Sequence, residues 1–341
     1  MEVKELTTSA AEWDAYVRQH PGACNYHQSG WKAVVEEGFR HTTRYLYAGD
    51  GGKIVGILPL VSMKSFLFGH FLVSLPFFNY GGILADNKAA EIVLLGEARR
   101  IAQEQHVDHI ELRHLLPVGC GLRTKTHKVT MILQLQADVD AQWKKFDAKL
   151  RNQIRKAEKS DVVVQIGSQE LVKEFYKVFA VNMRDLGTPV YSPELFKSIW
   201  RHFPKTTRIF LVSHKGQSIA AGLGTFFRDT IEVPWAGSMK AYRHLCPNML
   251  LYWEAIKFAI QHGLTKFDFG RSTPGEGTYR FKEQWGASGV PLTWEYWTAN
   301  SDALPDISPR NAKYELAIRM WKKLPLQVAN HLGPIIVRNI P

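Results

Sequence analysis

The sequence predicts an α+β fold with mixed sheets, present in two copies. A hairpin pattern that begins at Arg44 returns 164 residues later at Arg208. In both places a helical stretch and one more strand follow the hairpin. A period this long indicates two copies of one domain rather than a solenoid, and 341 residues is a length typical of two domains.

The elements of each copy follow from residue type and spacing. β-rich runs around Gly turns predict hairpins, and strands follow the two helical stretches. The expected elements of the first copy are strands 44–48 and 54–60, helix 89–105 and strand 109–113. Those of the second copy are strands 208–212 and 219–224, helix 247–262 and strand 266–270. In the last helix, Met249, Trp253, Ile256 and Ile260 share one apolar stripe, which predicts a face turned to the core.

Composition excludes several classes of protein. Hydrophobic residues make up 45% and charged residues 22%, which excludes a disordered chain. Three distant cysteines with no CxxC pair exclude a disulfide framework and favour a reducing cytosol. We find no signal peptide and no run long enough to span a bilayer. We therefore expect a cytoplasmic protein, or one held peripherally at the inner face of the membrane.

Positive charge is concentrated after residue 140. The chain has 43 Lys and Arg against 32 Asp and Glu, a net charge of +11. We expect four segments, 1–140, 141–160, 161–300 and 301–341: a first domain, a basic inter-domain helix, a second domain and a basic tail. Their net charges are −1, +5, +4 and +3. This distribution favours a phosphate-rich partner for the second half, and the alternative is a solvated basic surface.

The inter-domain helix carries Arg151 and Arg155, which share a face because they are four residues apart. Guanidinium groups on one face suit phosphate recognition. A polar connecting helix is the alternative.

A Gly-rich segment follows the last strand of the second copy. It contains Asp268-Phe-Gly-Arg-Ser272 and then Gly275-Glu-Gly-Thr-Tyr-Arg-Phe-Lys282. Small residues and cations in this order allow a backbone to approach an anionic ligand closely.

These motifs, together with Arg151-Asn-Gln-Ile-Arg155 and Leu75-Pro-Phe-Phe-Asn-Tyr-Gly-Gly82, resemble the FemAB family. The nearest resemblance is to its branch associated with the PEP-CTERM/exosortase system, over about residues 1–300. It implies two tandem GNAT-like domains, that is, the acyl-CoA N-acyltransferase fold. It also implies transfer of an aminoacyl or acyl group to an amine on a phosphate-linked cell-envelope or exopolysaccharide precursor. By the same resemblance, Lys282 assists the reaction and Arg151 or Arg155 contacts precursor phosphates. The long helical arm that holds tRNA in peptidoglycan members is absent from this sequence.

The chemistry of amine acylation adds further candidates. We expect Lys282, Asp268 and Tyr279 to be catalytic, with Asp268 orienting or deprotonating the amine. A strand-end carboxylate bonded to nearby backbone is the alternative for Asp268, and aromatic packing is the alternative for Tyr279. The expected substrate-binding residues are Arg151, Arg155, Arg271, Ser272, Tyr80, Trp235, Asn248 and Tyr252. Trp235 and Tyr252 can instead belong to the core or the wall of a cleft.

No cofactor or metal site is expected, because no metal-ligand spacing and no serine-nucleophile motif occurs. The co-substrate is an activated donor, aminoacyl-tRNA or an acyl thioester. At the start of helix 247–262 the stretch from Arg243 to Asn248 lacks the glycines of a pyrophosphate loop, and Pro247 has no N–H to donate. The alternatives are a GNAT N-acetyltransferase that uses acyl-CoA, and a non-catalytic RNA- or membrane-binding scaffold. In the tail, basic residues alternate with apolar ones. This pattern predicts either a helix on an anionic membrane or one docked on a domain.

Overall fold

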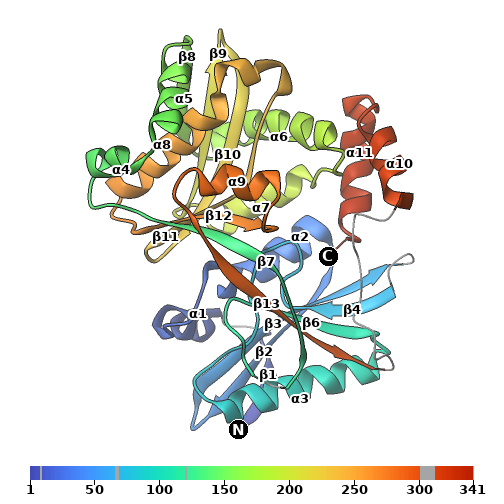
Figure 1. The fold of residues 1–341 in the computed structure, drawn as a ribbon. Coiled ribbons are helices and arrows are strands. Elements are labelled where there is room, and N and C mark those ends of the chain that lie inside the picture. Colours follow the sequence, from blue (N-terminus) through green and yellow to red (C-terminus); the bar gives the residue numbers. More distant parts are fainter. Residues whose placement is uncertain (8–9, 66–68, 120, 300–311, 341) are drawn as a thin grey trace. The chain divides into compact units, whose positions relative to one another are not determined.

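The computed structural model describes residues 1–7, 10–65, 69–119, 121–299 and 312–340. These residues form two compact units, and Figure 1 shows their elements. Unit 1 comprises the described residues within Met1–Lys128, Pro291–Ile307 and Arg338–Pro341. Unit 2 comprises those within Val129–Val290 and Ser308–Val337.

Unit 1 is an α+β unit whose sheet has the strand order β1-β2-β3-β4-β6-β13, with β5 paired to β3. Its strands are β1 (Glu2–Glu5), β2 (Thr42–Asp50), β3 (Lys53–Ser65), β4 (Gly69–Val73), β5 (Leu84–Ala85), β6 (His109–His114) and the end of β13 (Ser288–Thr298). Its helices are α1 (Ala10–Gln19), α2 (Gly30–Phe39), α3 (Lys88–Glu104) and the short 3-10 turn η1 (Asn25–His27). The predicted hairpin, helix and strand of the first copy are confirmed as β2–β3, α3 and β6.

Unit 2 repeats this plan, with strand order β7-β12-β11-β10-β9-β8. Its strands are the end of β7 (Arg123–Gln134), β8 (Val162–Gly167), β9 (Thr207–His214), β10 (Gln217–Phe227), β11 (Thr230–Ser238) and β12 (Lys266–Ser272). Its α-helices are α4 (Val139–Lys145), α5 (Ala148–Glu158), α6 (Val172–Leu186), α7 (Pro193–His202), α8 (Pro247–Gln261), α9 (Gly277–Glu283), α10 (Ala312–Trp321) and α11 (Leu326–Val337). Two short 3-10 turns, η2 (Gln169–Leu171) and η3 (Lys240–Leu245), also belong to this unit. The predicted hairpin, helix and strand are confirmed as β9–β10, α8 and β12.

The last strand of each copy belongs to the other unit. Strand β7 follows β6 in the chain, but its second half pairs with β12 in unit 2. Strand β13 follows α9, but its second half pairs antiparallel with β6 in unit 1. The units therefore differ from the boundaries expected from sequence at 140, 160 and 300, because a repeat in sequence does not reveal which sheet accepts the closing strand.

The basic helix expected between the domains is also part of unit 2. Helix α5 begins after Asp147, whose side chain accepts a hydrogen bond from the Leu150 N–H at 2.6 Å. Leu150, Ile154 and Ala157 are buried against unit 2, where α5 packs on α8. One face of this polar helix thus joins the core.

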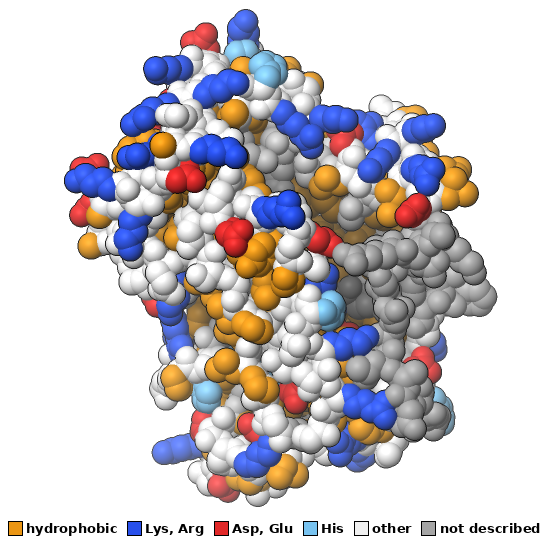
Figure 2. Space-filling model, in the orientation of Figure 1, with side chains coloured by type: hydrophobic (Ala, Val, Ile, Leu, Met, Phe, Trp, Pro, Cys, Tyr) orange, Lys and Arg blue, Asp and Glu red, His pale blue; other side chains and the backbone are white. Residues whose placement is uncertain are grey.

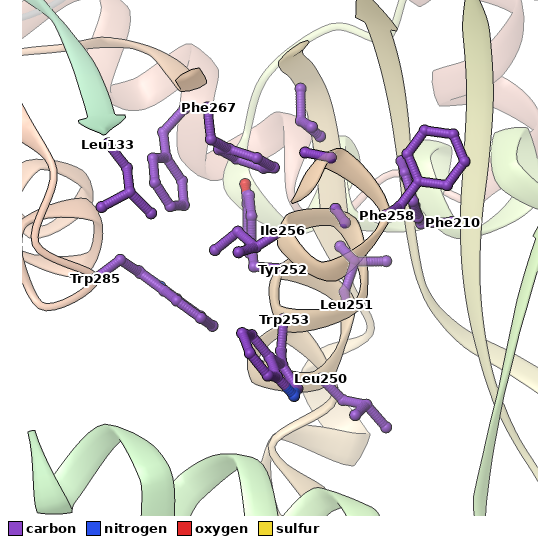
Figure 3. Close-up of a cluster of buried hydrophobic side chains, with 14 of the residues drawn as sticks. Leu133, Phe210, Leu250, Leu251, Tyr252, Trp253, Ile256, Phe258, Phe267 and Trp285 are labelled. Atoms are coloured by element: carbon purple, nitrogen blue, oxygen red, sulfur yellow. The ribbon is translucent and has the colours of Figure 1, made fainter. Parts of the chain in front are cut away.

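Helices cover both faces of the unit 2 sheet, with α8 on one face and α6 on the other (Figure 1). A Cβ built at Gly222 would meet Leu251 of α8, whereas one built at Gly237 would meet Asn182 of α6. On the α8 face the core is aromatic. Tyr252 lies among Phe267, Trp285 and Trp253 in Figure 3.

The C-terminal tail forms α10 and α11, and residues 300–311 lie outside the described residues. Within the described ranges, the structure contains no helix of the length and apolar character needed to cross a membrane.

Candidate active site

Strands β11 and β12 separate at a pair of buried carboxylates. The two strands run parallel but pair at only three positions, and the last pair is Glu232 with Asp268. Both strands continue beyond this point, so the ladder opens there. Paired residues of a ladder point to the same face of the sheet, and these two side chains are 2% and 0% exposed.

This face is the one opposite α8. The rings of Phe267 and Phe269 lie 6.3 and 5.2 Å from that of Tyr252 on α8, so Asp268 between them points the other way. Glu232 is in register with Thr225, and Thr225 with Thr207, all of them buried. A row of buried polar side chains therefore crosses the sheet and ends at the opening between β11 and β12.

Asp268 is held by hydrogen bonds within the fold. Its Oδ1 accepts from Thr130 Oγ1 at 2.6 Å and from the Gly270 N–H at 2.7 Å. Gly270 has φ +76° where the register of β12 with β7 shifts, a conformation that glycine adopts without strain. This is the backbone-bonded carboxylate that the alternative interpretation of the sequence described.

Lys282 is directed at the same turn. Its Nζ donates to the carbonyl oxygens of Gly270 and Arg271, each at 2.9 Å, and the side chain is 8% exposed. Burial lowers its pKa to about 8; the negative charges of Asp268 and Glu232 oppose this, and Arg271 adds to it. An ammonium group has three N–H donors. The two carbonyls use two of them, which leaves one for a ligand.

Three predicted substrate-binding residues hold buried polar atoms with no hydrogen-bond partner among the described residues. They are Ser272 Oγ, Asn248 Oδ1 and Arg151 Nε. Ser272 ends β12, two residues after the Gly270 turn, and Asn248 lies in the first turn of α8. A buried polar group without a partner costs about 1–3 kcal/mol, which a bound ligand can recover.

The other predicted residues are placed as follows. Tyr279 lies on α9 three residues before Lys282, is partly buried, and would contact a Cβ at Gly289 at 3.4 Å. Arg271 is partly exposed, and Arg155 is exposed with its guanidinium 5.4 Å from the Trp143 ring centre.

Two predicted residues belong to the core of unit 2. Tyr252 is packed against aromatic rings on the α8 face, and burial raises its pKa. Trp235 packs edge-on against Phe196 of α7 at 5.6 Å. Both positions agree with the alternative interpretation of these residues, because a large ring gains most by filling the core. Tyr80 lies in unit 1, 7% exposed, with its ring edge-on to Tyr26 at 5.7 Å.

Sequence reasoning missed Glu232. The available signal was a single acidic residue within the apolar run Ile231-Glu-Val233, because a carboxylate in a buried strand requires a compensating partner or a function.

Unit 1 has a parallel ladder of the same length, but β4 ends at the last pair and the carboxylate there is neutralised. Strands β4 and β6 pair in parallel at three positions, the last being Val73 with Glu111. Arg113 Nε donates to Glu111 Oε1 at 2.6 Å, and both residues are buried. Burial raises the pKa of Glu111, but the charge and hydrogen bond of Arg113 outweigh this and keep the pKa below its usual value. The arrangement with a lysine of lowered pKa therefore occurs in unit 2.

Comparisons with known proteins agree with this architecture. Residues 144–283 match the family model described as acetyltransferase (GNAT) domain. The fold resembles that of FemX, with a TM-score of 0.70 and 17% identity over 87% of this chain and 98% of that chain. A comparison with curated proteins gives no match.

Two other solved structures also cover most of the chain. The C-terminal domain of a putative lysylphosphatidylglycerol synthetase from Agrobacterium fabrum has a TM-score of 0.58 and 12% identity, over 85% of this chain and 92% of that one. A tandem GNAT protein from the clavulanic acid biosynthesis pathway has a TM-score of 0.54 and 12% identity, over 89% and 100%. The predicted tandem GNAT-like fold is confirmed.

Proposed function

We propose that the protein is an acyltransferase of FemAB type that moves an aminoacyl or acyl group to an amine on a phosphate-linked acceptor. The observation that carries this proposal is Lys282: buried, held by two carbonyl oxygens, and with a pKa lowered to about 8. At neutral pH it is mostly protonated, yet it can exchange a proton near physiological pH.

In the proposed reaction the acceptor nitrogen forms a bond to the carbonyl carbon of the donor, and the carbonyl oxygen takes up the electron pair. The third N–H of Lys282 donates to this oxyanion. The electron pair then returns, the bond to the leaving oxygen or sulfur breaks, and the proton that the former amine gives up is taken up by this leaving group. Asp268 acts as a positioning residue: it fixes Gly270, whose carbonyl orients Lys282.

The acceptor's phosphate would be bound by basic side chains of unit 2. Arg151 has a buried Nε without a partner among the described residues, and Arg155 and Arg271 are accessible. One of the similar structures belongs to a putative lysylphosphatidylglycerol synthetase. The product in that name is a phosphate-bearing lipid that carries an aminoacyl group, which supports this acceptor class. The motif resemblance supports an envelope or exopolysaccharide precursor in the PEP-CTERM/exosortase system.

The second candidate is an N-acetyltransferase that uses acyl-CoA, which the description of the matching family model favours. The start of α8 argues against this second candidate. There Cys246 adopts a left-handed conformation and Pro247 occupies the first helical position. Pro247 removes one backbone N–H donor from the helix N-terminus, where GNAT proteins of that kind hold the pyrophosphate.

The test is a panel of donors supplied to the purified protein with an amino sugar linked to a nucleoside diphosphate. Aminoacyl-tRNA, acetyl-CoA and a longer acyl-CoA are compared, and transfer is measured as the mass gain of the acceptor. We expect product with the aminoacyl or longer acyl donor, and at least ~100-fold less with Lys282→Met.

Lys266→Met is the matched control, because Lys266 lies on the same strand as Gly270 but is 41% exposed and paired with Asp229. Its rate should equal that of the wild type. Equal rates for Lys282→Met and wild type would overturn the role of Lys282. A folded protein that transfers from none of the donors would count against the acyltransferase proposal.

A further inference from the structure

Helix α11 has two faces of different character. Ala329, Gly333 and Val337, four residues apart, are buried. Val328, Leu332, Ile335 and Ile336 recur at the i, i+4, i+7, i+8 spacing of an amphipathic stripe, yet they are 39–56% exposed. The helix therefore docks through its small side chains and leaves its large aliphatic ones in solvent.

The docking itself is close and specific. A Cβ built at Gly333 would lie 2.8 Å from the Val190 backbone nitrogen, so only glycine allows this approach. Arg184 Nη1 donates to the Leu324 carbonyl at 3.4 Å, and a Cβ at Gly187 would meet Ile318 of α10 at 2.5 Å. The helical pair is thus fixed on unit 2, and the exposed stripe does not serve its attachment.

Helix α10 extends the apolar surface and adds basic charge. Leu316 and Met320, one turn apart, are each 63% exposed. Arg319 pairs with Glu315 at 3.2 Å, whereas Lys322 and Lys323 have no ion pair within the described part of the chain. The stem of Lys322 lies beside Gly187 on the docking side of α10, so Lys323 is the lysine on the side of Leu316 and Met320. Figure 2 shows hydrophobic and basic side chains next to one another over this helical pair.

We infer that the exposed face of α10 and α11 binds the surface of a membrane that contains anionic phospholipid. Aliphatic side chains beside an unpaired lysine on a basic helical pair are the pattern of an interfacial helix, where the stripe enters the acyl boundary and the lysine contacts phosphates. Lysine is depleted in protein–protein interfaces, where aromatic residues and arginine dominate. Lys323 therefore favours lipid over a second protein. This inference does not depend on the proposed function.

The experiment is cosedimentation of the full chain with vesicles of phosphatidylcholine alone or mixed with phosphatidylglycerol. We expect binding to the anionic vesicles that weakens with salt, and little binding to the neutral ones. Lys323→Gln should lower the binding constant about fivefold, since one basic contact to an anionic surface is lost. Leu332→Gln/Ile335→Gln should lower it at least about tenfold.

The controls remove the same groups elsewhere. Lys205→Gln removes one exposed lysine of unit 2, and Ile92→Gln/Val163→Gln removes two exposed aliphatic residues. Both control variants should bind as the wild type does. Absence of binding to anionic vesicles would overturn the inference, as would equal losses in tail and control variants.

The inference would also be overturned if the free protein formed a dimer, did not bind vesicles, and lost the dimer in Leu332→Gln/Ile335→Gln. The exposed stripe would then bind a second copy of the chain. Transfer to a soluble acceptor should be unchanged in the tail variants. Failure of this inference and failure of the proposed function are therefore distinguishable.

Discussion

Replacing Asp268 by asparagine should lower the pKa of Lys282 further. Asparagine keeps an oxygen that can accept from Thr130 and from the Gly270 N–H, so the turn is preserved. The substitution removes the negative charge, which raises the pKa of Lys282 against the effect of burial. Asp268→Asn is therefore a test of electrostatics rather than of geometry.

The size of the effect follows from the hydrogen-bond chain. Lys282 Nζ is 2.9 Å from the Gly270 oxygen, and the Gly270 nitrogen is 2.7 Å from Asp268 Oδ1. With one glycine between them, the two charges lie within about 9 Å of each other. At an effective dielectric constant of about 20, their attraction is then at least about 1.8 kcal/mol. That energy lowers the pKa by about 1 or more when the carboxylate charge is lost.

The assay is an NMR titration of the Lys282 side chain, with its signal assigned through Lys282→Met. In the wild type we expect a pKa of about 8, and a clearly lower value in Asp268→Asn. Asp229→Asn is the control, because Asp229 pairs with Lys266 at the protein surface and should leave the titration of Lys282 unchanged. An unchanged or raised pKa of Lys282 in Asp268→Asn would refute the electrostatic account.

Three further predictions concern stability. Lys282 has a folded-state pKa of about 8 against a usual value of 10.5, so the folded state binds fewer protons between these values and its stability rises with pH. In urea unfolding, the free energy of unfolding of the wild type should rise by up to about 3 kcal/mol between pH 8 and 10.5. Lys282→Met should lack this rise. Burial lowers the pKa of His27 from 6.5 to about 4, so the folded state binds fewer protons than the unfolded state between these pH values. The free energy of unfolding should therefore fall by up to about 3 kcal/mol as the pH falls from 6.5 to 4. In His27→Gln the free energy of unfolding should depend less steeply on pH over this range. Gly82→Ala should lower the free energy of unfolding by about 3 kcal/mol or abolish folding, because the new Cβ would lie 2.1 Å from buried His114. Gly96→Ala on α3 is the control. Its new Cβ meets nothing within 4 Å, so this substitution should be neutral or slightly stabilising. Equal effects of the two alanine substitutions in urea unfolding would contradict the packing described for unit 1.

The repeated hairpins, helices and strands could be predicted from sequence because each has a local signal. Pro247 and Gly263 bracket α8, and the apolar stripe beginning at Met249 gives that helix its inward face. The exchange of β7 and β13 could not be predicted in this way. Strand pairing depends on contacts between residues far apart in the chain, and either sheet offers an apolar edge to such a strand.

The candidate site could be predicted in part. Lys282, Asp268 and Ser272 belong to local motifs, and the structure places them around the turn at Gly270. The protonation state of each of these side chains could not be predicted. Burial and neighbouring charges determine a side chain's pKa, and both depend on the tertiary structure. Glu232 comes to the site only through its register with Asp268 across the short parallel ladder.

The central claim is that protonated Lys282 stabilises charge in the transition state, and the most direct test is the ratio of transfer rates of the wild type and Lys282→Met at two pH values. The pH dependence of the acceptor amine cancels in this ratio. At pH 7 we predict a wild-type advantage of at least ~100-fold. Above the Lys282 pKa of about 8 this advantage should shrink, because the ammonium loses its proton. A ratio near one at pH 7 would contradict the account.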